Sequence, residues 1–228
     1  MKNNTGYISM KVWVRVIIMA VLLISMTSCS SKEESLKYYS IGLKAYSEKN
    51  LKIAIENFEK AIDQDKKNIS ARNMLGKSYY YSQRFEDSKK VFDDIVDDFP
   101  GNASAHVWSA RILMYENPTP EKVKEAKEKL LYAIQLDDAN PDAHYHLAKL
   151  YEYEGNVVNA LLEYNSALKL GSQISRIHKD LATLYKKAGM EDRALEHMQA
   201  LSSSDRIAAS GETNNEEEVP KKKKKGLK

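Results

Sequence analysis

MLGKSYYYSQRF (residues 74–85) is one of several similar stretches in this chain. HLAKLYEYEGNV (146–157) and DLATLYKKAGME (180–191) show the same order: an apolar residue, a small residue, a Tyr three positions later, and then a short polar loop. A sequence that repeats its own pattern describes one structural unit several times. The repetition therefore decides the fold, and its register is the first quantity to establish.

The small residue of this motif fixes the register. It recurs with gaps of 34, 34, 38 and 34 residues, at Gly42, Gly76, Ala110, Ala148 and Ala182. A second small residue follows after twelve residues, or after sixteen in the third copy, at Ala54, Ser88, Ala126, Ala160 and Ala194. A bulky residue stands four positions later, at Phe58, Phe92, Leu130, Tyr164 and Met198. Such spacings place the three sets on buried helix faces, so the sequence predicts five helical hairpins.

This pattern resembles the tetratricopeptide repeat, a helix–turn–helix unit of 34 residues. The second copy carries it most fully, with Leu75, Gly76, Tyr79, Phe92 and Pro100. The resemblance implies an all-α fold, a right-handed α-solenoid in which each hairpin buries its apolar face against its neighbours. It covers residues 35–201 as five repeats: 35–68, 69–102, 103–140, 141–174 and 175–201.

The third copy is four residues longer than the others. The insert falls at ENPTPEK (116–122), where Pro118 and Pro120 forbid helix continuation. We expect a longer turn between the two helices there. The turn is either a tolerated insertion or a protruding contact point. The array also lacks a clear amphipathic helix after the fifth repeat, so we expect its last helix to be frayed or covered by a partner.

In tetratricopeptide proteins the first helix of each repeat lines a concave wall, and the resemblance implies the same wall here. Its ninth repeat position carries a cation in the three central copies: Lys77, Arg111 and Lys149. Other wall positions carry mainly tyrosines, at Tyr39, Asn73, Tyr80, Tyr81, Tyr115, Tyr145, Tyr153 and Lys179. Cations pair with carboxylates and Tyr offers flat apolar area, so we expect a groove for extended acidic or C-terminal peptides. The alternative is that the rings fill space and the cations form a solvated face.

The N-terminal segment reads as an export signal. An apolar run, VIIMAVLLI (16–24), follows Arg15 and is too short to span a bilayer. SMTSCSS (25–31) resembles the lipobox of bacterial lipoproteins, which implies cleavage after residue 28 and a diacylglyceryl and N-acyl lipid on Cys29. Cys29 is the one cysteine of the chain, so it has no internal disulfide partner. A simple cleaved signal and an uncleaved anchor helix are the alternatives.

Outside the repeats, residues 29–34 are expected to be a linker and residues 202–228 a disordered charged tail. The part between residues 29 and 201 holds 25 Lys and Arg against 27 Asp and Glu. This near neutrality argues against a nucleic-acid partner. We find no phosphate loop, nucleophile motif or zinc motif, and so expect neither an enzyme nor a cofactor or metal. His106, His144 and His178 share one repeat position and are interpreted as packing residues.

The sequence thus predicts a lipid-anchored scaffold that binds envelope proteins or peptides in its concave groove. The expected location is the bacterial cell envelope, facing the periplasm from the outer membrane, or the cell surface. The alternative function is a glycan- or peptidoglycan-binding module that assists a cell-wall enzyme. The sequence leaves the partner, the leaflet and the oligomeric state open.

Overall fold

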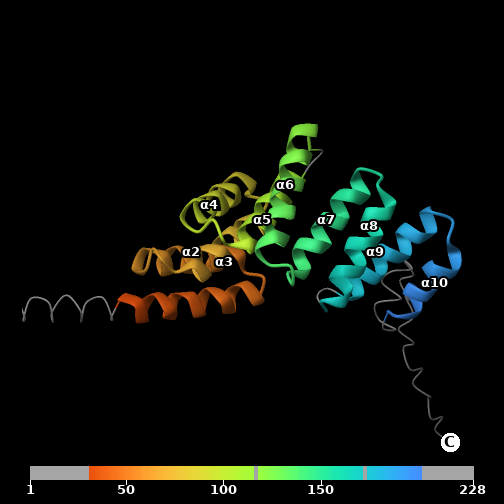
Figure 1. The fold of residues 1–228 in the computed structure, drawn as a ribbon. Helices are drawn as coiled ribbons and strands as arrows, with labels where there is room; N and C mark the ends of the chain where they lie inside the picture. Colours follow the sequence, from red (N-terminus) through yellow and green to blue (C-terminus); the bar gives the residue numbers. More distant parts are fainter. Residues whose placement is uncertain (1–30, 116–117, 172–173, 202–228) are drawn as a thin grey trace, which may run out of the picture. The chain divides into compact units, whose positions relative to one another are not determined.

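The computed structural model describes residues 31–115, 118–171 and 174–201 (Figure 1). These residues form helices joined by short turns, and no strand occurs among them. The expected all-α fold is confirmed. The signal segment with Cys29, residues 116 and 117 of the insert, and the tail from residue 202 lie outside the described residues.

The chain divides into two compact units between Asp138 and Ala139. Unit 1 begins with a helical segment over residues 31–47, so residues 31–34, expected as a linker, are already helical. It continues with α2 (Leu51–Gln64), α3 (Ile69–Tyr81), α4 (Phe85–Asp98), α5 (Ala103–Leu113) and α6 (Pro120–Leu136). Unit 2 contains α7 (Pro141–Tyr153), α8 (Val157–Lys169), α9 (Ile174–Lys187) and α10 (Glu191–Gln199).

Within each unit, consecutive helices pack against one another as hairpins, which is how a repeat array buries its apolar faces. The small residues of the register let these helices approach closely. A Cβ built on Gly76 would lie 2.7 Å from Cε2 of Phe92, and one on Gly42 would lie 2.6 Å from Cε1 of Phe58. In these two hairpins, therefore, the absence of a side chain on the glycine lets the first helix contact the aromatic ring of the second helix directly.

Local signals begin and end the helices where the register requires. Side-chain oxygens at the N-caps accept a hydrogen bond from the third residue of the helix, at Asn50, Asn68, Asn102, Thr119, Asn140 and Asn156. The turns inside the unit 2 hairpins use glycine in the left-handed conformation, Gly155 (φ 74°) and Gly189 (φ 73°). At the same repeat position, unit 1 places Lys49 (φ 60°) and Gln83 (φ 61°).

The insert of the third repeat does more than lengthen a turn. Four second helices start three residues before their small buried residue, for example Phe85 before Ser88, whereas α6 starts at Pro120, six before Ala126. Thr119 caps this extra turn and Pro120 occupies its first position, where a proline needs no N–H partner. The inserted residues therefore extend the helix, because Pro120 opens it rather than interrupting it.

Among the described residues, no helix has both the length and the apolar character needed to span a bilayer.

Candidate functional site

Trp108 lies at the centre of the expected wall in unit 1. The guanidinium of Arg111 lies 3.9 Å from its ring centroid and the ammonium of Lys77 lies 5.3 Å from it. Phe92 stacks on the same indole at 5.6 Å, and only 7% of Trp108 is exposed. A cation over the face of a Trp is attracted by the ring quadrupole. Trp108 thus positions the two wall cations that the sequence singled out.

The tyrosines surround this indole. Tyr80 packs edge-on against Trp108 at 5.4 Å and lies 5.0 Å from the Arg111 guanidinium, and Tyr115 packs on Phe85 at 3.8 Å. Tyr81 is 51% exposed and contacts the edge of Trp108 at 6.1 Å. Arg111 therefore joins two repeats by lying over one ring of each.

Two further polar groups belong to this wall. Asn73 lies one helical turn before Lys77, and its Oδ1 is buried without a hydrogen-bond partner among the described residues. Burial and the neighbouring Tyr81 raise the pKa of Tyr46, which the charge of Arg111 partly offsets. Tyr46 is therefore a protonated hydroxyl at neutral pH. The wall of unit 1 presents cations and hydroxyls around exposed aromatic area.

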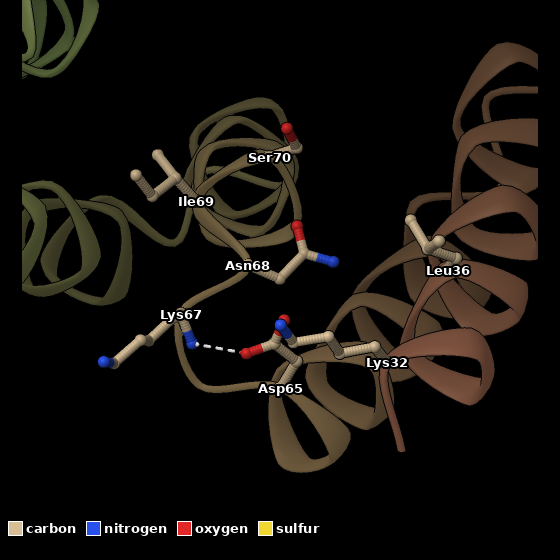
Figure 2. A pocket seen from close by; sticks show the side chains of 7 residues that line it. All are labelled: Lys32, Leu36, Asp65, Lys67, Asn68, Ile69 and Ser70. Atoms are coloured by element: carbon tan, nitrogen blue, oxygen red, sulfur yellow. Dashed lines mark hydrogen bonds between the residues drawn. The ribbon is translucent and has the colours of Figure 1, made fainter. Parts of the chain in front are cut away.

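Tyr39 does not belong to this surface. It is half-buried and packs on Phe58 at 5.9 Å, so it fills the core between the first helical segment and α2. A hollow of about 360 Å³ lies nearby, between Leu36 and the start of α3 (Figure 2). Asp65 and Asn68 in its lining are engaged locally: the Lys67 N–H donates to Oδ1 of Asp65, and Asn68 bonds both Ser35 and the Ala71 N–H. The hollow is the outer side of a tight turn rather than a binding site.

Unit 2 surrounds its wall cation with carboxylates. Nζ of Lys149 lies 3.0 Å from Oε2 of Glu152 and 4.0 Å from Oδ1 of Asp180, and Lys187 reaches the other Glu152 oxygen at 3.5 Å. Tyr145, expected on the wall, is only 1% exposed and donates its hydroxyl to Asp180 at 2.8 Å. This expectation is corrected, because the ring of Tyr145 belongs to the core of unit 2.

Glu152 is the centre of this network. Burial alone would raise its pKa, but hydrogen bonds from Lys149 and from the Tyr164 hydroxyl (2.8 Å) bring the pKa below its usual value. Burial raises the pKa of Tyr164 in turn, so its proton stays on the phenol. Tyr153 and Lys179 are exposed. They are the expected wall residues of unit 2 that face solvent outside the network.

The three histidines of one repeat position each contact a nearby partner: His144 and His178 reach the second helix of their own hairpin, and His106 reaches the loop before α5. His106 bonds the Pro100 carbonyl through Nε2 at 2.9 Å, and His144 bonds Glu163 through Nδ1 at 2.6 Å. His178 meets Nδ1 of His197 at 2.9 Å, and burial lowers the pKa of both rings. These contacts agree with a packing role. Among the described residues, no three metal-ligating side chains gather in one place.

Comparison with known proteins agrees with this architecture. A family model described as tetratricopeptide repeat matches residues 45–114. Residues 45–114 therefore match the tetratricopeptide repeat family. A relative, the DnaJ homolog subfamily C member 3 homolog of Dictyostelium discoideum, is 26% identical over 170 residues, which is 73% of this chain and 32% of the relative. The chain therefore spans about a third of the length of the curated relative that it matches.

Solved tetratricopeptide structures resemble the fold. TTC0263 of Thermus thermophilus superposes with a TM-score of 0.68 at 18% identity, covering 78% of this chain and 97% of that one. PilF of Pseudomonas aeruginosa gives 0.56 at 18% identity, covering 81% and 100%. At these identities the likeness shows the fold. Tetratricopeptide folds are typically scaffolds without catalysis, and their curved arrays offer extended binding surfaces.

Two residues that matter here escaped the sequence analysis. Trp108 occupies a repeat position outside those expected to line the wall, and Asp180 lies one repeat beyond the Lys149 it neutralises. An aromatic residue three positions before Arg111 was a usable signal, because side chains at that spacing share a helix face. The pairing of Asp180 with Lys149 had no comparable signal.

Proposed function

We propose that this protein is a lipid-anchored scaffold of the bacterial cell envelope that binds extended acidic segments of partner proteins on the wall of unit 1. The observation that carries the proposal is the placement of Arg111 and Lys77 over Trp108. Among the described residues, Arg111 has no ion pair with a carboxylate, so its N–H donors are available to one from a partner.

The surrounding groups suit an extended peptide. The exposed ring of Tyr81 offers apolar area at little entropic cost, as tyrosines do in other recognition surfaces. The Oδ1 of Asn73 is buried, so a peptide would contact the wall through its cations and exposed rings instead. A peptide that supplied both a carboxylate and an apolar side chain would match the wall. The typical scaffold role of the fold argues against catalysis.

A displayed library of random peptides, selected on the full chain, tests the proposal. We expect enrichment of Asp and Glu next to aromatic or aliphatic residues. Lys77→Glu with Arg111→Glu should weaken binding of the selected peptides by at least about a hundredfold, since two attractive charges become repulsive. The matched control is Lys149→Glu, which changes a cation already paired with Glu152 and should leave binding within about twofold. Equal losses in both variants would contradict the choice of unit 1.

The envelope anchor is tested separately. Replacing the lipidation residue, Cys29→Ala, should release the chain from the membrane fraction while peptide binding persists. Mass spectrometry that found Cys29 unmodified in the mature chain would refute the anchor. Calorimetry with muropeptides addresses the alternative: the exposed ring of Tyr81 could stack on a sugar. Muropeptide binding that tolerated the double charge reversal and was lost with Tyr81→Ala would favour the glycan-binding function.

A further inference from the structure

One solvent-facing line runs along the second helix of every repeat. It consists of the residues two before and two, six and ten after the small buried residue. In α2 these are Lys52, Glu56, Lys60 and Gln64, and in α4 they are Glu86, Lys90, Asp94 and Asp98, all exposed. In α10 the line starts with Asp192 and Glu196, also exposed. A charged line at this position is what a water-facing helix surface requires.

The same line on α8 is apolar. It reads Val158, Leu162, Ser166 and Leu170, and the three apolar residues are 70%, 61% and 40% exposed. On α6 the line begins with Lys124 and Glu128 and turns apolar at Tyr132 and Leu136, and Tyr132 packs on the ring of His106 at 4.9 Å. Of the five second helices, α8 is thus the one whose described line holds no charge. The lines of α2, α4 and α10 serve as an internal reference, and they show that a second helix does not need apolar residues here.

We propose that this stripe, Val158, Leu162 and Leu170, is the contact through which two copies of this chain associate, with their α8 helices antiparallel. The surroundings favour a second copy over a charged partner or an anionic lipid surface. The charged residues of α8 are Glu163, which is bonded to His144 at 2.6 Å, and Lys169. Asn165 and Ser166 donate to carbonyls of their own helix. A lipid-binding helix would carry cations along both flanks.

The ends of the stripe set the direction. Lys169 stands at the C-terminal end of α8, and Glu154 lies just before its N-terminal end. A two-fold axis across the middle of the helix brings Lys169 of one copy near Glu154 of the other, whereas a parallel pair would bring like charges together. The stripe is about 18 Å long, from the rise of a helix over twelve residues. One such helix pair is a small interface, so we expect a weak dimer, which the local concentration on a membrane would favour.

Cross-linking in membranes tests the contact with the full chain. Leu162→Cys should give a product of twice the chain mass with a short bis-maleimide. Lys90→Cys is the matched control, because Lys90 occupies the same position of the same line in the second repeat and is also exposed. The unsubstituted chain, treated in the same way, shows how much product forms through Cys29 alone. Equal cross-linking of Leu162→Cys and Lys90→Cys would overturn the proposal.

The mass of the detergent-solubilised full chain, followed by light scattering over a range of concentrations, gives a second readout. Leu162→Asp should weaken dimerisation by at least about thirtyfold, since it buries an unpaired charge in the contact. Lys90→Asp should leave it unchanged, which also controls for association through the micelle. Helical content should be preserved in both, because both side chains are exposed. A chain that is monomeric at every concentration, or a dimer that tolerates Leu162→Asp, would refute the second copy as occupant.

Discussion

The two units place a cation at the same repeat position and surround it differently. In unit 1, Lys77 and Arg111 lie over the ring of Trp108, whereas in unit 2 Lys149 lies between Glu152 and Asp180. A guanidinium stacked on a ring keeps its N–H donors pointing outward, while a carboxylate at 3.0 Å engages the donors of the ammonium. Repeat register therefore locates the wall, and the residue one turn away on the same helix, Trp108 for Arg111 and Glu152 for Lys149, decides whether the cation lies over a ring or forms an internal ion pair.

The largest effect that separates the units concerns their packing. Unit 1 sets Gly76 against Phe92, whereas unit 2 sets Ala148 against Tyr164 at the same repeat positions. Gly76→Ala should destabilise unit 1 by about 1–3 kcal/mol, because the new methyl group would overlap a fully buried ring, and this outweighs the gain in helix propensity. Urea unfolding followed by the fluorescence of Trp108 measures the change in free energy of unfolding.

The reciprocal change is the control. Ala148→Gly should cost about 1 kcal/mol in unit 2, through the lost methyl group and the poorer helix propensity of glycine. A stabilising effect of Gly76→Ala would show that the Phe92 ring can move aside, and that the close approach of α3 and α4 is not set by the glycine.

The second effect is a gain of acidic-peptide binding by the wall of unit 2. Glu152→Gln keeps the size of the side chain and removes the charge that engages Lys149 and Lys187. We expect acidic peptides selected on unit 1 to gain about fivefold in affinity for the wall of unit 2, because the two cations no longer have this internal partner. Titration of a labelled peptide against a chain carrying Lys77→Glu and Arg111→Glu isolates this weak binding. Glu163→Gln, whose carboxylate bonds His144 away from these lysines, should produce no gain.

The smallest effect is a pH dependence confined to unit 2. Burial lowers the pKa of both His178 and His197. The pKa of His197 is also raised by nearby Glu196 and lowered by Arg193, and the ring of Tyr185 stacks on the His197 imidazole. On α8, Glu163 is engaged with His144. Because the pKa values of both imidazoles are lowered in the folded state, the unfolded hairpin binds more protons than the folded hairpin once the pH falls below about 6.5. The stabilisation is complete above that value and is lost on acidification.

Amide hydrogen exchange between pH 7 and pH 5, corrected for its intrinsic pH dependence, measures this loss as several-fold faster exchange in α10. The helices α2 to α4 should show no such change over the same range, because their sequences contain no histidine. Exchange in α10 that stayed constant would mean that one shared proton keeps the two imidazoles together throughout the range.

The fold could be predicted from the sequence because its determinants are local and repeated. Residues equivalent to Gly76, Ser88 and Phe92 occur at the same spacing in the first, fourth and fifth repeats, so the pattern of one repeat predicts the structure of the others. The walls could be predicted only in part. Tyr80, Tyr81 and Tyr145 are all tyrosines at expected wall positions, yet Tyr81 is half exposed, whereas Tyr145 lies in the core of unit 2 and donates its hydroxyl to Asp180 of the next repeat. Which residue meets which across a repeat boundary depends on helix approach distances that no periodicity specifies.

The extra turn at the start of α6 shows which spacings in such an array are fixed and which can vary. Glu121 and Lys122 in that turn are exposed, whereas Val123 and Ala126 below it return to the buried face. Hairpin tips are thus free to grow, while the interval between buried contacts is held constant. The family match ends at residue 114, just before the chain departs from its even spacing, although the stacking of helices in unit 1 continues through α6. A search for a fixed repeat length therefore fails at the first lengthened turn, whereas the helix–helix contacts identify the repeat that follows it.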